Sequence, residues 1–210
     1  MGIKLDNRKY QWKDTDSSRA EYPYIENWVT ANSKVIDLGC GNGSLLAFLK
    51  NKKNIKEYGI EISESGVSVC KKKGLNVRQG RIDEHLPDLG DNSFDLAICN
   101  VTLQMLMYPE VTLWEMKRIA KKQIISFPNF AFIINRFELL LKGRMPKKML
   151  FGYNWYDTGH IHQFSICDFK DLIEKNSMKV KNEVQLGRIL GLKDIFPNAF
   201  SNIAVYLLEK

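Results

Sequence analysis

The sequence predicts an α/β protein with a mostly parallel, twisted sheet and helices on both of its faces. Strand-like apolar runs alternate with amphipathic, helix-like runs through residues 34–129, and such alternation is typical of parallel strands joined by right-handed crossovers. A glycine-rich stretch, VIDLGCGNG at 35–43, closes the first strand. Because ligands of doubly wound sheets bind at the carboxyl ends of the strands, these glycines mark the predicted site.

Each element follows from a local pattern of residues. Strands are predicted at 34–39, 57–63, 75–80, 93–101, 122–129, 179–187 and 201–210, where β-branched and apolar residues gather. Helices are predicted at 44–52, 65–74, 102–121, 130–146 and 166–178. Pro109 interrupts the third of these helices, and Gly143 and Pro146 end the fourth.

Length and composition favour one soluble, globular domain over residues 1–210. The chain has 210 residues, of which 44% are hydrophobic and 26% charged. Residues 1–32 are interpreted as an N-terminal extension and helix, and residues 130–163 as an insertion or lid over the sheet. The start of the chain lacks the apolar core of a signal peptide, and no run approaches the length of a membrane span. We therefore expect a cytoplasmic protein.

Charge and cysteine usage restrict the classes of partner and site. The net charge is +7, from 31 Lys plus Arg against 24 Asp plus Glu, which by itself could indicate nucleic acid binding. The basic clusters are short, at Lys50–Lys53, Lys71–Lys73 and Lys117–Lys122, which favours the outer faces and ends of helices. The four cysteines form no CxxC pair, so we expect them reduced and mostly buried: Cys40, Cys70, Cys99 and Cys167.

The spacing of the glycines distinguishes between several classes of nucleotide-binding site. A turn without Cβ atoms lets a ligand approach the main chain, and the following helix offers unpaired N–H groups. The NAD fingerprint would require a glycine at position 44, where Ser44 stands, so a dinucleotide site is disfavoured. A phosphate loop is excluded because no Gly-Lys-Ser or Gly-Lys-Thr follows.

The pattern D-x-G-x-G-x-G, formed by Asp37, Gly39, Gly41 and Gly43, resembles motif I of class I S-adenosylmethionine-dependent methyltransferases. The resemblance implies a Rossmann-like class I methyltransferase fold in which the turn, with Cys40, wraps the methionine part of the cofactor. It also implies that an acid ending the second strand binds the ribose. That acid is Glu61, 18 residues past Gly43, with Ile62 beside it. The plainer alternatives are that Glu61 is a strand-end charge and that Asp37 only braces the turn.

The adenine contact departs from the pattern of the superfamily. An acid usually follows the third strand there, but Arg81 occupies the aligned position. Either Asp83 replaces it, or Ile82 contacts the adenine through its backbone. After the fourth strand, Asn100 and Gln104 are candidates to face the cofactor or a methyl acceptor.

A longer resemblance narrows the family. The segments VIDLGCGNGSLL, YGIEIS, DNSFDLAICNVTLQ, ISFPNF, NRFELLLKGRMP and NWYDTGHIHQFS are similar to those of the MetW family, the methionine-biosynthesis proteins. The resemblance implies S-adenosylmethionine as cofactor, S-adenosylhomocysteine as its product form and a homoserine O-acyltransferase as partner. We expect a protein that supports methionine biosynthesis with that enzyme. The alternative is a methyltransferase acting on an unidentified small molecule.

An aromatic loop carries the candidates for catalysis. Tyr153, Trp155, Tyr156, Asp157, His160 and His162 lie within ten residues, and Tyr156 or His162 would serve as a general base or an orienting donor. The alternative, which we favour, is a structural lid packed on the cofactor or a partner. Two histidines without a third ligand do not predict a metal site.

Two further segments concern partners. NVTLQ, after the fourth strand, lacks the Pro-Pro-aromatic sequence of amino methyltransferases that act on nucleic-acid bases, so we do not expect a nucleic acid substrate, nor a membrane. The predicted helix at 130–146 carries Phe137, Leu140 and Leu141, and basic residues are found at Arg144, Lys147 and Lys148. This pattern suits docking on another protein, although the leucines would equally serve to cover the sheet.

Overall fold

The computed structural model describes residues 12, 18–147, 154–156, 158–187 and 191–210. Its centre is a seven-stranded sheet with the order β3-β2-β1-β4-β5-β7-β6. The strands are β1 Lys34–Leu38, β2 Lys56–Glu61, β3 Val77–Gln79, β4 Phe94–Asn100, β5 Ala120–Pro128, β6 Lys179–Leu186 and β7 Ile203–Glu209. Only β7 pairs antiparallel with its neighbours, β5 and β6, so the sheet is mostly parallel, as predicted.

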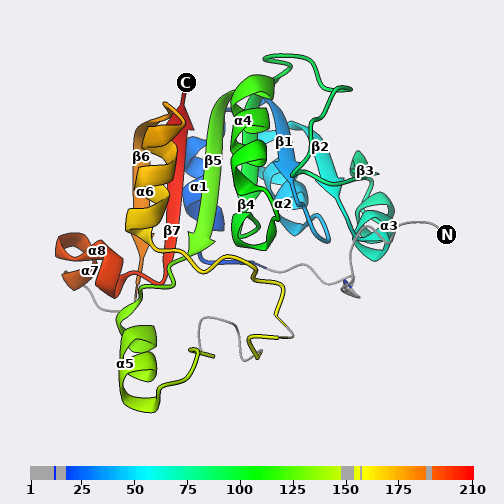
Figure 1. Cartoon of the computed structure of the whole chain (residues 1–210). Helices are drawn as coiled ribbons and strands as arrows, with labels where there is room; N and C mark the ends of the chain where they lie inside the picture. The colour runs from blue at the N-terminus through cyan, green and yellow to red at the C-terminus, as the bar shows by residue number, and fades with distance from the viewer. Residues whose placement is uncertain (1–11, 13–17, 148–153, 157, 188–190) are drawn as a thin grey trace.

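Helices cover both faces of the sheet, which confirms the predicted Rossmann-like architecture (Figure 1). One face packs against α1 Tyr22–Trp28, α2 Ser44–Lys53 and α3 Glu64–Lys72. The other packs against α4 Pro109–Ile119 and α6 Ile166–Lys175. Each face therefore has its own apolar core, and the near-continuous burial of β1, β4 and β5 follows from this double covering.

The predicted helices form, but several are shorter than predicted: α4 begins at Pro109 rather than at 102, and α5 covers 133–142 rather than 130–146. Pro109 stands at the first turn of α4, where its missing N–H is not needed, and a short 3-10 helix, η1 Leu103–Met105, precedes it. Gly143 caps α5, Ile133–Lys142, in the left-handed conformation with φ of 57°. The basic clusters place lysines and Arg118 in the last turns of α2, α3 and α4, where their positive charges interact favourably with the negative end of the helix dipole.

Two short helices are additions that the sequence did not predict. These are α7 Leu192–Ile195 and α8 Pro197–Phe200, which connect β6 to β7. The segment predicted as an insertion begins beyond β5, and α5 lies past the carboxyl edge of the sheet (Figure 1). Within the part of the chain that the structure describes, none of the helices has the length and apolar character needed to cross a membrane.

Candidate functional site

The glycine turn joins the carboxyl end of β1 to the start of α2. Gly39, Gly41 and Gly43 have φ values of 82°, 58° and 74°, a region that side chains with a Cβ rarely adopt. The backbone N–H groups of Gly39 and Cys40 both donate to the carbonyl of Ile60, at 2.8 and 3.2 Å. The turn is thereby fastened to the end of β2, beside which the predicted acid lies.

Close packing adds a second reason for glycine in this turn. A Cβ on Gly39 would lie 2.5 Å from Cγ2 of Thr102, which follows β4. A Cβ on Gly43 would lie 2.5 Å from a methyl group of Leu75 and 2.8 Å from the sulfur of Cys70. The glycines therefore allow three neighbouring segments to meet at the turn.

Glu61 ends β2 and reaches back into the turn. Its side chain is buried, and its carboxylate accepts hydrogen bonds from the N–H of Gly41 at 2.8 Å and of Ser63 at 2.9 Å. Ser63 in turn caps α3 by accepting from the N–H of Gly66. The residue predicted to bind a ribose thus lies at the turn. Its carboxylate also holds the segments that precede α2 and α3, through Gly41 and Ser63.

Asp37 lies at the base of the turn, in a buried position near the end of β1. Burial, assisted by the nearby Glu61 and opposed by Arg19, raises the pKa of its carboxyl to about 7. Among the described residues, none forms a hydrogen bond with its Oδ1 atom. A buried acidic oxygen without a partner is suited to bind a cation or a donor from a ligand.

The carboxyl end of β4 lies beside the glycine turn, where Thr102 packs against the first glycine. Asn100 donates from its amide to Glu21 at 3.2 Å and accepts from the hydroxyl of Ser126. The next residue, Val101, has φ of 52°, a strained conformation for a β-branched side chain. Glu21 is almost fully buried and comes from the segment before α1. Its role could not be predicted, because it lies 79 residues from Asn100 in the sequence.

The loop after β3 contains the unusual Arg81. Its guanidinium pairs with the carboxylate of Asp83 at 2.8 Å, and the same Oδ2 atom accepts from the N–H of Met107 at 2.9 Å. Ile82 packs in the core that faces α4, and its carbonyl accepts from the hydroxyl of Thr112. Asp83 therefore ties this loop to the segment before α4, and Arg81 compensates its charge.

Trp12 is a residue of the site that the sequence did not indicate. A Cβ on Gly41 would lie 2.8 Å from Cη2 of its indole ring, and a Cβ on Gly66 would lie 3.0 Å from Cδ1. Its backbone N–H donates to the hydroxyl of Ser65 at 3.4 Å. The ring thus lies across the gap between the glycine turn and the start of α3, so a ligand on this surface must touch or displace it.

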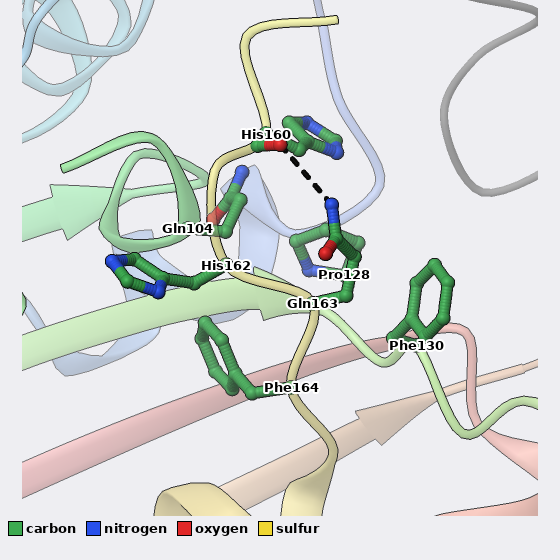
Figure 2. A pocket seen from close by; sticks show the side chains of 7 residues that line it. All are labelled: Gln104, Pro128, Phe130, His160, His162, Gln163 and Phe164. Carbon is green, nitrogen blue, oxygen red and sulfur yellow. Dashed lines mark hydrogen bonds between the residues drawn. The ribbon is translucent and has the colours of Figure 1, made fainter. Parts of the chain in front are cut away.

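The aromatic loop lies beside η1, near the end of β5 (Figure 2). The backbone carbonyl of Gln104 accepts from the N–H groups of Ile161 and His162, at 2.9 and 3.0 Å. His162 is exposed and Tyr156 is 71% exposed, whereas His160 is buried. Tyr153 and Asp157 lie outside the described residues. The structure therefore places the two predicted catalytic side chains at the surface.

A small cavity separates this loop from the end of β5. Its volume is about 10 Å³, room for a single water molecule. Its lining residues are Gln104, Pro128, Phe130, His160, His162, Gln163 and Phe164.

Of the four cysteines, Cys40, Cys70 and Cys99 are buried and Cys167 is exposed, and all four are free thiols. Where the chain is described, its His, Cys, Asp and Glu side chains form no group of three that could hold a metal ion.

Known proteins are similar to this chain in sequence or in architecture. Residues 19–208 match the family described as methionine biosynthesis protein MetW. The chain belongs to the MetW family. A relative in Rhodopirellula baltica, the bifunctional methionine biosynthesis protein MetXA/MetW, is 32% identical over 165 residues. These residues are 74% of this chain and 26% of the relative, so the chain matches about a quarter of that longer protein.

Solved structures confirm the fold of this MetW protein as that of class I methyltransferases. One is a Thermotoga maritima structure described as a SAM-dependent methyltransferase, possible histamine N-methyltransferase. It is 21% identical, with a TM-score of 0.66, and the match covers 91% of this chain and 87% of the Thermotoga chain. An S-adenosylmethionine-dependent methyltransferase from Mesorhizobium loti is 12% identical with the same TM-score, covering 91% and 98%. At such identities the likeness concerns the fold alone.

Replacing Gly39 by Ala should destabilise the protein by about 2–4 kcal/mol, since a left-handed Ala costs about 1 kcal/mol and overpacking costs about 1–3. Urea unfolding measures this change. Gly143→Ala is the matched control, because Gly143 also has positive φ but no neighbour within 4 Å of its Cβ. Adding Thr102→Ser should restore part of the loss by removing the clashing methyl group. Equal effects of the two Gly→Ala changes would show that the packing at Gly39 is unimportant.

Proposed function

We propose that this MetW protein binds S-adenosylmethionine at the glycine turn and acts in methionine biosynthesis. The observation that carries the proposal is the pair of buried carboxylates, Asp37 and Glu61, beside a turn of three left-handed glycines at the carboxyl ends of β1 and β2. The unpartnered Oδ1 of Asp37 suits the ammonium group of the cofactor's methionine part. Glu61 suits the two ribose hydroxyls, which would share or replace its bonds to Gly41 and Ser63.

The remaining predicted cofactor residues have different roles in this proposal. Cys40 and Ile82 pack in the two cores, so they shape the cradle through their backbones. Ile62 is half-buried beside Glu61, where its side chain would cover one side of the adenosine. Asp83 is tied to Arg81 and Met107, so it would position the adenine loop. Asn100 would face the methionine part from the end of β4.

A partnership with a homoserine O-acyltransferase is the second part of the proposal. In the Rhodopirellula baltica relative, MetXA and MetW are parts of one protein, which supports a shared task. If the cofactor binds one state of the complex better than another, it shifts the equilibrium between those states by linkage. The cofactor, itself made from methionine, would thereby report methionine supply to the acyltransferase.

Methyl transfer to a small molecule is less well supported by the geometry. A general base acts on a substrate that is positioned and shielded from water, whereas Tyr156 and His162 are exposed. We therefore place cofactor binding and partnership ahead of catalysis. Steady release of S-adenosylhomocysteine in the presence of a defined acceptor would reverse this order.

Removing the carboxylate of Glu61 tests the cofactor site. Glu61→Ala should weaken S-adenosylmethionine and S-adenosylhomocysteine binding about tenfold or more, because charge-assisted hydrogen bonds are worth roughly 1.5–3 kcal/mol. Isothermal titration calorimetry measures both affinities. Glu64→Ala, an exposed acid three positions later on α3, is the matched control and should bind normally. Unchanged affinity in folded Glu61→Ala would place the ribose elsewhere.

The raised pKa of Asp37 predicts a pH dependence of cofactor binding. Below about pH 7 the carboxyl of the ligand-free protein holds a proton, whereas the ammonium group of the cofactor binds the ionised form. The affinity should therefore fall as the pH decreases from 7 to 5, by up to about tenfold per unit, with release of one proton on binding. Calorimetry in buffers of different ionisation enthalpy measures both quantities. In Asp37→Asn the affinity should be weaker and nearly independent of pH over this range; a slope equal to that of the wild type would exclude Asp37.

Trp12 should report occupation of the site by its fluorescence. Its ring lies on Gly41 and Gly66, so a bound cofactor changes the surroundings of the indole. Addition of S-adenosylhomocysteine should change the tryptophan emission of the wild type, and most of this change should be absent in Trp12→Phe. Trp114→Phe, on the exposed side of α4, should retain it. A full signal in Trp12→Phe would mean that the ligand binds away from this ring.

A further inference from the structure

Helix α5 projects from the carboxyl edge of the sheet and is held mainly at its first turns (Figure 1). Asn135 is the one buried residue of α5, and its amide donates to the carbonyl of Phe130 at 2.9 Å. The guanidinium of Arg136 donates to the carbonyls of Ala131 at 2.6 Å and Asn198 at 3.3 Å. The base of the helix is thus fixed to the body, while the rest extends away.

The projecting part of α5 exposes large apolar side chains. Phe137 is 53% exposed, and Leu140 and Leu141 are each 77% exposed. Positions 137, 140 and 141 share one side of the helix, because residues three and four apart are neighbours there. The alternative that these leucines cover the sheet is therefore wrong. An isolated helix of ten residues is marginal in water, so this apolar surface is suited to a partner.

Basic residues border the same surface. Lys142, Arg144 and Lys147 are exposed at the end of α5 and just beyond it. Glu138 is the acid of this helix, and it pairs with Lys142 at 3.5 Å. The partner surface that fits is consequently an apolar groove with an acidic border.

We propose that the surface formed by Phe137, Leu140 and Leu141 on α5 docks the homoserine O-acyltransferase, an inference that rests on the partnership proposed above. The Rhodopirellula baltica relative supports this occupant, because it carries MetXA and MetW in one protein. In that relative the covalent connection gives one part a high effective concentration around the other, which favours a direct contact surface between them. The exposed apolar residues of α5 provide such a surface, at the same carboxyl edge of the sheet as the glycine turn.

The test compares two variants of the full chain. Leu140→Glu combined with Leu141→Glu should bind the purified acyltransferase of the same organism roughly tenfold or more weakly than wild type, since buried apolar anchors dominate interfaces. Trp114→Glu is the matched control: Trp114 is 56% exposed on α4, and the affinity should not change. Surface plasmon resonance measures the affinities, and sedimentation velocity measures self-association. Calorimetry with S-adenosylhomocysteine should show equal cofactor binding in wild type and the double variant.

The possible failures are distinguishable. Equal binding of the acyltransferase by wild type and the double variant would overturn the docking surface and leave the partnership intact. No binding by wild type would overturn both. A wild-type dimer that becomes a monomer in the double variant, with no acyltransferase bound, would assign the surface to a second copy of the chain. Loss of cofactor binding in Glu61→Ala concerns the cofactor proposal alone, because Glu61 lies in the glycine turn rather than on α5.

Discussion

The hydrogen bond from the backbone of Gly41 to the carboxylate of Glu61 joins the ends of the first two parallel strands. It fixes the glycine turn, from which α2 starts, while the second oxygen of Glu61 holds Ser63, which caps α3. The starts of both helices therefore depend on one buried carboxylate. The left-handed glycines allow this arrangement because their backbone can turn towards the acid without a clash.

The same region keeps features that cost stability. Asp37 is buried, its Oδ1 atom has no hydrogen bond from the described residues, and its raised pKa reflects the cost of ionising it in a buried position and, secondly, beside Glu61. Val101, next to the Thr102 that packs against Gly39, holds a strained backbone conformation. Such features persist where a ligand offsets their cost, which is consistent with a cation bound at Asp37.

The proposed cofactor site and the proposed docking surface lie at the same edge of the sheet. The glycine turn follows β1, and α5 begins a few residues after β5. Asn129 connects the end of β5 to the rest of the molecule, since its side chain bonds the backbones of Ala131, Ile166, Asn198 and Ser201. A partner on α5 would thus contact an element that is rigidly connected to the strand ends, which gives a physical route for the cofactor to influence the complex.

The sequence by itself determined the alternating elements, the glycine turn and the position of Glu61. These features follow from hydrophobic period and turn chemistry, which act over a few residues. Only the tertiary structure decided that Trp12 covers the turn, that Asp83 pairs with Arg81 and Met107, and that α5 leaves Leu140 exposed. Helical spacing placed Leu140 on the apolar side of a helix, but it did not determine whether the sheet or a partner covers that side. Contacts between distant segments depend on how the strands are ordered in the sheet, and no local pattern encodes that order.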